Sequence, residues 1–119
     1  MDFDITRMAI LSRMEVAKNP ATSPVSLTIL SQDAYWRVRG NVAENPNTPP
    51  EIIVTLSQDP DWGVRCVVAA ATNTPPEILV TLSQDEDWGV RYNVAKNSST
   101  PYEIWSIVSP IGSVIRTLP

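Results

Sequence analysis

The sequence predicts an all-α protein in which about four two-helix repeats stack into a small α-solenoid. Three observations carry this prediction: a 26-residue internal repeat, a Thr-Pro helix start in three of the four repeats, and apolar runs too short to form a core on their own. Short helix pairs cannot bury their apolar faces alone, whereas stacked copies bury them against one another. We therefore expect a single helical-repeat domain over residues 1–119.

The repeat is visible in residues that recur at a constant step. Tryptophan and arginine recur every 26 positions, at Trp36, Trp62 and Trp88 and at Arg13, Arg39, Arg65 and Arg91. The letters SQD recur with the same step from Ser31, Ser57 and Ser83. These positions divide the chain into repeats at residues 7–32, 33–58, 59–84 and 85–110, followed by a tail at 111–119.

The first helix of each repeat is expected to begin at an aspartate and to end at an asparagine. Asp33, Asp59 and Asp85 are favourable N-cap residues. Asn45 and Asn97 tolerate a left-handed exit from a helix end. Ala71 occupies the corresponding position in the third copy, so we expect that helix to continue further.

The second helix of each repeat is expected to begin with a capping box. The segments TPPE at 48–51 and 74–77 and TPYE at 100–103 place Thr at the N-cap and Glu at N3, with Pro in the first turn where no N–H is needed. The first copy, TSPV at 22–25, lacks the Glu, so we expect a weaker cap there. Each apolar run that follows is about two turns long, which fits an α-helix or a partly 3-10 helix.

The recurring tryptophans and arginines each have a structural and a functional interpretation. We expect each Trp to pack between its own helices and the next repeat; the alternative is a recognition strip of the kind found in single-stranded nucleic-acid grooves. Asp61 and Asp87 stand four residues before Arg65 and Arg91, which favours helix-surface ion pairs. Arginine can also donate to carbonyls of the inter-repeat turns. A row of arginines that holds phosphates is the minority interpretation, because many carboxylates lie nearby.

A second set of positions varies from copy to copy and lies on one helical face. In the third copy these are Gly63, Cys66, Val67 and Ala70, at the spacing i, i+3, i+4, i+7. Because residue size at these positions is not held constant, we expect the face to point outward. The candidate partner-binding residues are Met14, Arg37, Asn41, Cys66, Val67, Ala70, Tyr92, Asn93 and Lys96. The alternative is a neutral solvent-facing surface.

The amino-acid composition excludes several classes of function. The chain has no His and one Cys, Cys66, so the commonest general base, the commonest metal ligand and an intrachain disulfide are all missing. We expect no enzyme activity, no catalytic residues, no metal and no cofactor. The net charge of −4 makes nucleic acid an unfavoured partner. No secretory signal and no membrane-spanning apolar run are found, so we expect a cytoplasmic protein.

The repeat unit W-x-V-R-x-x-V-A-x-N-x-x-T-P-x-x-I/L-x-x-L-x-x-D resembles the variant leucine-rich repeat family of bacteria. The residues that carry the resemblance in the second copy are Trp36, Val38, Arg39, Val42, Ala43, Asn45, Pro46, Thr48, Pro49 and Leu56. The resemblance implies a right-handed, HEAT-like superhelix of alternating α and 3-10 helices with a role in protein interaction. The repeat here is slightly longer than the family's, so the second helix is expected to be more fully α-helical. A Cys-ligated iron–sulfur cluster known in the family cannot be carried over to a chain with one cysteine.

We therefore expect a non-catalytic protein-interaction or scaffolding module with a protein partner. The main alternative is a nucleic-acid-associated HEAT-like repeat protein. Exposed arginines would favour that alternative, and arginines buried against carboxylates would favour the protein-interaction module. Self-association through the open solenoid ends is a third alternative, in which the apolar segment that starts at Ile104 docks onto another chain.

Overall fold

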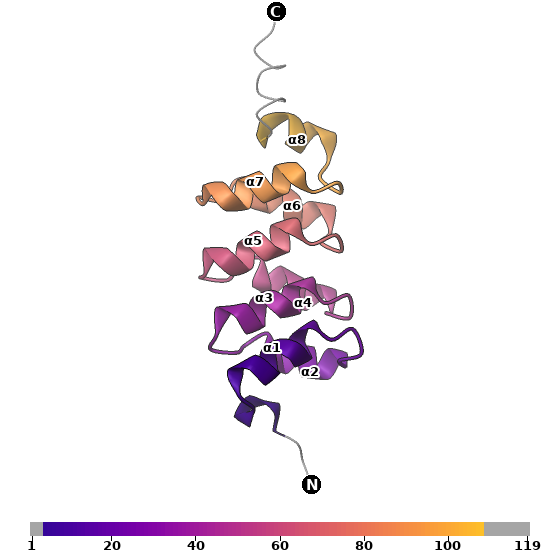
Figure 1. Ribbon diagram of the computed structural model, residues 1–119. Coiled ribbons are helices and arrows are strands. Elements are labelled where there is room, and N and C mark those ends of the chain that lie inside the picture. Colours follow the sequence, from indigo (N-terminus) through magenta and orange to yellow (C-terminus); the bar gives the residue numbers. More distant parts are fainter. Residues whose placement is uncertain (1–3, 109–119) are drawn as a thin grey trace, which may run out of the picture.

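The computed structural model describes residues 4–108, which form an elongated stack of short helices (Figure 1). A 3-10 turn, η1 (Ile5–Arg7), comes first. Nine-residue helices follow as α1 (Ile10–Lys18), α3 (Trp36–Glu44), α5 (Trp62–Ala70) and α7 (Trp88–Lys96). They alternate with seven-residue helices, α2 (Pro24–Leu30), α4 (Pro50–Leu56), α6 (Pro76–Leu82) and α8 (Tyr102–Val108). The predicted all-α solenoid is confirmed, and the second helix of each pair is α-helical.

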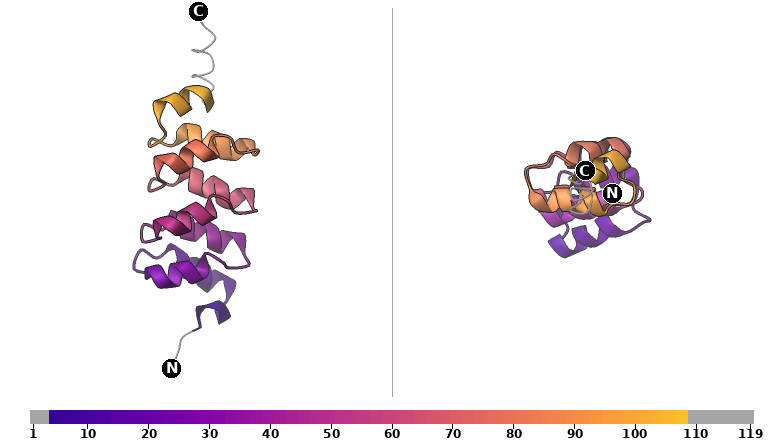
Figure 2. Two further views of the ribbon diagram at one scale, coloured as in Figure 1. Left: turned by 180° about the vertical axis from the view of Figure 1, so that it is seen from behind. Right: turned by 90° about the horizontal axis from the view of Figure 1, so that it is seen from above.

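The helices form two layers. The nine-residue helices lie side by side on one face, since α1 contacts α3, α3 contacts α5 and α5 contacts α7. The seven-residue helices form the other layer, which faces the viewer in the reversed view (Figure 2). Each of α2, α4 and α6 contacts the nine-residue helix before it and the one after it, and α8 packs on α7. Every nine-residue helix is therefore held by both its own partner and its neighbours.

The core lies between the layers and repeats with the helices. The nine-residue helices contribute small apolar side chains that are fully buried, namely Val38, Val42, Ala43, Val64, Val68, Ala69, Val90 and Val94. The seven-residue helices contribute larger ones that are at most 2% exposed, namely Leu27, Leu30, Ile53, Leu56, Leu79 and Leu82. Burying one Val, Leu or Ile side chain stabilises a fold by about 1.5–3 kcal/mol. Because each repeat supplies only part of every core layer, stability depends on stacking.

The predicted capping boxes are wrong. Thr48 does not cap α4, whose N-cap is Pro49; its Oγ1 instead donates to the Val42 carbonyl at 2.5 Å. Thr74 makes the same bond to the Val68 carbonyl at 2.6 Å. The Val42 carbonyl also accepts the Asn45 N–H at 3.1 Å, so the buried threonine adds a second donor to a carbonyl at the end of α3. The threonine therefore joins the two helices of a repeat.

The start of α2, in the first copy, has a side-chain cap, whereas the starts of α4 and α6 have none. Ser23 is the N-cap of α2, and its Oγ accepts a hydrogen bond from the Ser26 N–H at 3.2 Å. The prediction of a weaker cap in this copy is therefore wrong. A serine before the proline supplies the side-chain cap that Pro49 and Pro75 cannot supply for α4 and α6.

The nine-residue helices begin two residues later than predicted. Their N-caps are Tyr35, Asp61 and Asp87. The predicted N-caps Asp33, Asp59 and Asp85 each accept the backbone N–H two residues further on, at 2.9 Å. Each of these carboxylates also binds an arginine of the preceding helix pair. They therefore join neighbouring repeats rather than start a helix.

The asparagines at the helix ends bind the backbone of the preceding repeat. No residue in 4–108 has a positive φ, so the predicted left-handed exit is wrong. The Asn45 side-chain amide donates to the carbonyls of Ala17 and Asn19, both at 2.8 Å. Asn97 makes the equivalent pair of bonds two joints further on, between α5 and α7. Helix α5, which Ala71 follows, ends at the corresponding residue, so the prediction that it continues is wrong.

The joint between α3 and α5 lacks two of these amide donors. Ala71 stands at the position of Asn97. Val67 stands at the position of Asn93, whose side-chain amide donates to the Cys66 carbonyl at 3.0 Å. An alanine and a valine cannot make such bonds. This joint therefore depends more on apolar contact than the joints on either side of it.

Replacing Ala71 with asparagine is expected to stabilise the protein. By analogy with Asn97, the new amide would donate to the carbonyls of Ala43 and Asn45. One net hydrogen bond contributes about 0.5–1.5 kcal/mol, and the free energy of unfolding, measured in urea, should rise by that amount. The exposed neighbour Thr72 provides a control, since Thr72→Asn should change stability by less than about 0.5 kcal/mol. A loss of stability in Ala71→Asn would contradict the role assigned to these asparagines.

Candidate functional site

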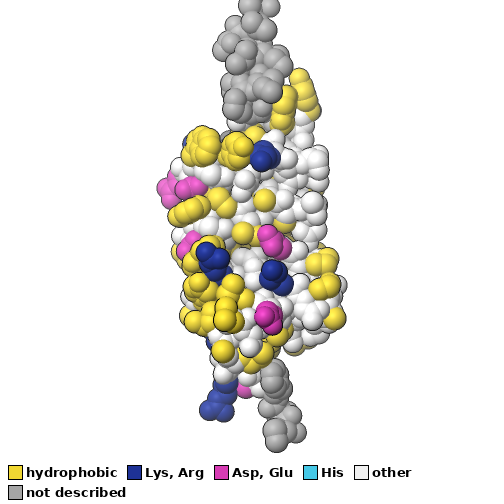
Figure 3. Space-filling view, viewed as in Figure 1, with side chains coloured by type: hydrophobic (Ala, Val, Ile, Leu, Met, Phe, Trp, Pro, Cys, Tyr) yellow, Lys and Arg dark blue, Asp and Glu magenta, His cyan; other side chains and the backbone are white. Residues whose placement is uncertain are grey.

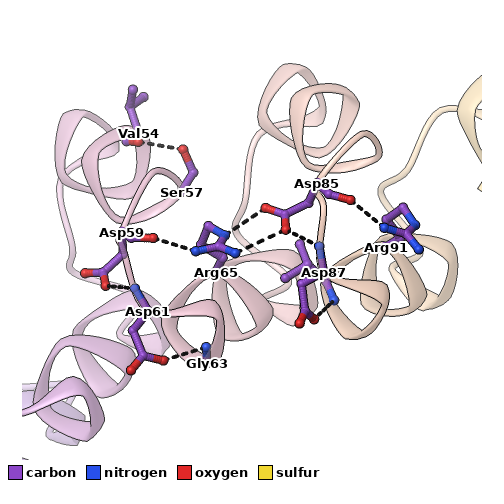
Figure 4. A network of polar contacts seen from close by, with 10 residues as sticks. Val54, Ser57, Asp59, Asp61, Gly63, Arg65, Asp85, Asp87 and Arg91 are labelled. Atoms are coloured by element: carbon purple, nitrogen blue, oxygen red, sulfur yellow. Dashed lines mark hydrogen bonds and ion pairs between the residues drawn. The ribbon is translucent and has the colours of Figure 1, made fainter.

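Arginine and aspartate side chains form a ladder along the solenoid (Figure 4). Arg39 donates to Asp59 through Nε at 2.8 Å and through Nη2 at 3.1 Å. Arg65 donates to Asp85 in the same way at 2.8 and 3.2 Å. In the first repeat, the distance from Arg13 Nε to Asp33 is 2.6 Å. We call these three pairs the Arg–Asp ladder.

Each arginine of the ladder also binds a main-chain carbonyl in the loop before its own helix. Nη1 of Arg39 donates to the Asp33 carbonyl at 2.7 Å, and Nη1 of Arg65 to the Asp59 carbonyl at 2.8 Å. The ladder side chains are only 6–15% exposed. The predicted bonds to turn carbonyls are confirmed. The predicted i,i+4 pair between Asp61 and Arg65 is wrong, because the bidentate and partly desolvated pair with the next repeat is the stronger interaction.

The ladder shifts the pKa values of Asp85, Arg39 and Arg65. Burial raises the pKa of Asp85, but the hydrogen bonds from Arg65 and from the Asp87 N–H, with the charges of Arg65 and Arg91, outweigh burial and place it below its ordinary value. The pKa values of Arg39 and Arg65 are raised, chiefly by the hydrogen bonds to their aspartates. Both partners therefore stay charged at neutral pH.

Aromatic side chains of the nine-residue helices reach solvent. Trp62 is 59% exposed, Trp88 68% and Tyr92 41%, and Trp36 is half-buried. Hydrophobic side chains gather at the left of the face shown in Figure 3, over α3, α5 and α7. We call Trp36, Trp62, Trp88 and Tyr92 the aromatic stripe.

The prediction that each Trp packs between helices is wrong for Trp62 and Trp88. Each is the first residue of its helix, and the buried Val64 is the second residue after Trp62. Residues i and i+2 do not share a helix face. Valine and leucine already fill the space between the layers, so the indole rings remain outside it.

The rings of the stripe have different neighbours. Trp88 and Tyr92 stack with centroids 5.1 Å apart. The Arg37 guanidinium lies 5.0 Å from the centre of the Trp36 ring, and the Lys96 ammonium lies 5.2 Å from that of Tyr92. Such distances are within the range of cation–π attraction. Among residues 4–108, neither a stacked ring nor a cation of this kind lies on Trp62.

A hollow of about 360 Å³ opens between two tryptophans of the stripe. Trp36, Asp61, Trp62, Gly63 and Cys66 line it. A Cβ added to Gly63 would lie 3.0 Å from the Trp36 ring and 2.9 Å from Asp61 Oδ1, so glycine permits this close approach. Burial, with the charges of Asp87 and Asp85, raises the pKa of the Cys66 thiol, which therefore stays neutral.

The structure divides the predicted partner-binding face. Its exposed members are Arg37, Ala70, Tyr92 and Lys96, and its half-buried members are Met14, Asn41, Cys66, Val67 and Asn93. Arg37, Tyr92, Lys96 and Cys66 lie in or beside the aromatic stripe. The amides of Asn41 and Asn93 bind carbonyls of the preceding helix and serve the joints between repeats. Their role in partner binding stays a prediction.

From the sequence, Trp62 and Trp88 were assigned to packing because they recur between copies, with a recognition strip as the alternative, and Asp61 was assigned to an ion pair with Arg65. The signal that could have placed the tryptophans in this site is helical spacing. Trp62 and Cys66 are four residues apart, as are Trp88 and Tyr92, and such pairs share a helix face. The tryptophans therefore belong to the variable face rather than to the core positions.

Comparison with family models supports the repeat architecture. The model described as leucine rich repeat variant matches residues 36–61, which is one full period and includes α3, α4 and the ladder residue Asp59. This segment is similar to the leucine rich repeat variant, and the same residues recur with the same step on both sides of it, which fits the stacked helix pairs of the fold. Comparisons with curated proteins and with solved structures give no match.

The part of the chain from residue 4 to residue 108 contains no group of three His, Cys, Asp or Glu side chains placed to hold a metal ion. None of its helices has the length and apolar character needed to cross a membrane. The features that stand out in these residues are the ladder and the stripe.

Acidification is expected to weaken the joint made by Arg65 and Asp85. Since the folded-state pKa of Asp85 is lowered, its carboxylate stabilises the fold above about pH 4 and loses this effect as the pH falls through the folded-state value. The free energy of unfolding should therefore fall as the pH is lowered from about 5 through the folded-state pKa of Asp85. Asp85→Asn should be less stable at neutral pH and should show a smaller fall.

The exposed Glu77 supplies the control for this experiment, because it makes no ion pair within the described residues. Glu77→Gln should follow the wild-type dependence on pH. If Asp85→Asn and wild type instead lost stability in parallel on acidification, the Arg65–Asp85 pair would not be the source of the effect.

Proposed function

We propose that this protein is a non-catalytic protein-interaction module and that the aromatic stripe contacts its partner. The observation that carries the proposal is the exposure of Trp62 and Trp88, at 59% and 68%, on a rigid helical scaffold. Tryptophan, tyrosine and arginine are enriched among the residues that dominate protein interfaces. An exposed apolar strip of this kind is a liability for a protein that binds nothing.

The proposed contact surface includes part of the predicted face. Arg37, Tyr92 and Lys96 flank the tryptophans, and Cys66 lies in the hollow between two of them. We further propose that residues 1–119 act as one helical-repeat domain, because each joint depends on the helices on both sides of it. A single cysteine suits a reducing compartment, so we place the module in the cytoplasm.

The state of the arginines favours a protein partner over nucleic acid. Arg13, Arg39 and Arg65 are 13–15% exposed and are paired with aspartates. To bind phosphates they would have to break these pairs, and the net charge of −4 opposes a polyanion. Self-association through the ends of the stack remains the alternative in which the partner is a second copy of the chain.

Affinity capture from a lysate of the source organism tests the proposal. Wild type should be compared with a Trp62→Ser/Trp88→Ser variant, which removes two rings of the stripe. The control is Val54→Ser/Val80→Ser, which removes two side chains that are 44% and 40% exposed on α4 and α6, in the other layer. The same proteins should be recovered by wild type and control and lost by the stripe variant, while circular dichroism shows all three to be folded.

Two outcomes would contradict the proposal. Equal recovery by all three proteins would exclude the stripe as the contact surface. Recovery that nuclease treatment and moderate salt abolish would instead indicate nucleic acid as the partner.

A further inference from the structure

We propose that the hollow between Trp36 and Trp62 binds the positively charged end of an arginine or lysine side chain from the partner protein. This inference rests on the proposed function and specifies the chemistry that the aromatic stripe recognises. It commits to one occupant, a basic side chain inserted between the two indole rings with its charge directed at Asp61.

The hollow combines aromatic walls with an unpaired carboxylate. Oδ1 of Asp61 accepts the Gly63 N–H at 2.7 Å. The ion pairs within residues 4–108 use Asp33, Asp59 and Asp85, so the charge of Asp61 is matched by no ion pair there. Aromatic faces beside a carboxylate attract a cation through the ring quadrupole and through direct charge attraction. A planar guanidinium also stacks on an indole face.

The stripe itself shows this preference for cations. Trp36 carries the Arg37 guanidinium, and Tyr92 carries the Lys96 ammonium. One repeat along from Arg37 the residue is Gly63, and one repeat back from Lys96 it is Ala70. The third copy therefore lacks a cation at both positions from which its neighbours supply one. Among the described residues, Trp62, which forms a wall of the hollow, is the ring of the stripe with neither a cation nor a stacked ring on it, because Trp88 is stacked on Tyr92.

The charges nearest the hollow are the Asp61 carboxylate, which lines it, and the Arg37 guanidinium on the Trp36 ring, and further carboxylates follow one repeat along. Asp87 lies just before α7 as Asp61 lies just before α5 (Figure 4), and Glu86 precedes Asp87 in the sequence. The only other titratable side chain that lines the hollow, Cys66, is held neutral by its raised pKa and brings no opposing charge. With a net charge of −4, the chain attracts a basic segment over a distance and the hollow then fixes one of its side chains.

Titration with short peptides tests the inference. The probe is an N-acetylated, C-amidated peptide of alternating glycine and arginine with three arginines, followed by calorimetry and by tryptophan fluorescence. Matched peptides replace arginine with lysine or with citrulline, the neutral isostere. We expect saturable binding of the arginine and lysine peptides, and binding of the citrulline peptide at least about tenfold weaker, since it keeps the shape and loses the charge.

Two variants separate the contributions of ring and charge. Trp62→Leu keeps an apolar side chain but loses the aromatic face, and it should bind the arginine peptide about three- to thirtyfold more weakly. Asp61→Asn keeps a good helix cap but loses the charge, and it should weaken binding as well. Glu77→Gln, which removes one charge from α6 in the other layer, should bind like wild type and so excludes a general effect of net charge.

Three results would overturn the inference: equal affinity for the arginine and citrulline peptides, unchanged affinity in Trp62→Leu, or no saturable binding of any peptide. These results are distinct from failure of the proposed function. If the capture experiment still requires the aromatic stripe while the arginine peptide does not bind, the interaction module stands and the basic side chain is the wrong occupant. If the peptide binds at Trp62 but capture does not depend on the stripe, the cation site stands and the proposed contact surface is wrong.

Discussion

Each arginine of the Arg–Asp ladder binds two loops at once, and this fixes the step from one helix pair to the next. Arg65 holds the carbonyl of Asp59 in the loop before α5 and the carboxylate of Asp85 in the loop before α7. Because Trp62 and Trp88 each follow such an aspartate by three residues, their positions are set by the same bonds. The ladder therefore provides the scaffold on which the aromatic stripe is displayed.

The joints of this scaffold are not equivalent, and the hollow lies at the exceptional one. Between α3 and α5, Val67 and Ala71 replace asparagines, and Val67 lies 3.5 Å from where a Cβ on Gly40 would be. Gly63 in turn lets the Trp36 ring approach the start of α5. The joint that has fewest side-chain bonds to the backbone is thus the most apolar one. It is also the place where the stripe opens far enough to admit another side chain.

The 26-residue period was sufficient to predict the solenoid, because a regular step in sequence requires a regular step in space. The roles of individual residues were less predictable. Thr48 and Asp59 suit local caps by type, but Asp59 is bound by Arg39, twenty residues away, and a local rule cannot detect such a partner. Trp62 was assigned to the core because it is constant, and its exposure depends on which side chains already fill the space between the layers.

Of the residues that recur between repeats, the tryptophans form a solvent-exposed surface, whereas the arginines stabilise the fold. The free energies of unfolding of Trp62→Ala and Arg65→Met, measured side by side in urea, test this difference most directly. We predict a loss of less than about 2 kcal/mol for Trp62→Ala, because most of its ring is already in water, and a larger loss, up to about 3–5 kcal/mol, for Arg65→Met, which leaves Asp85 without its partner. A loss of about 3–5 kcal/mol for Trp62→Ala, the cost of removing a core tryptophan, would contradict the account.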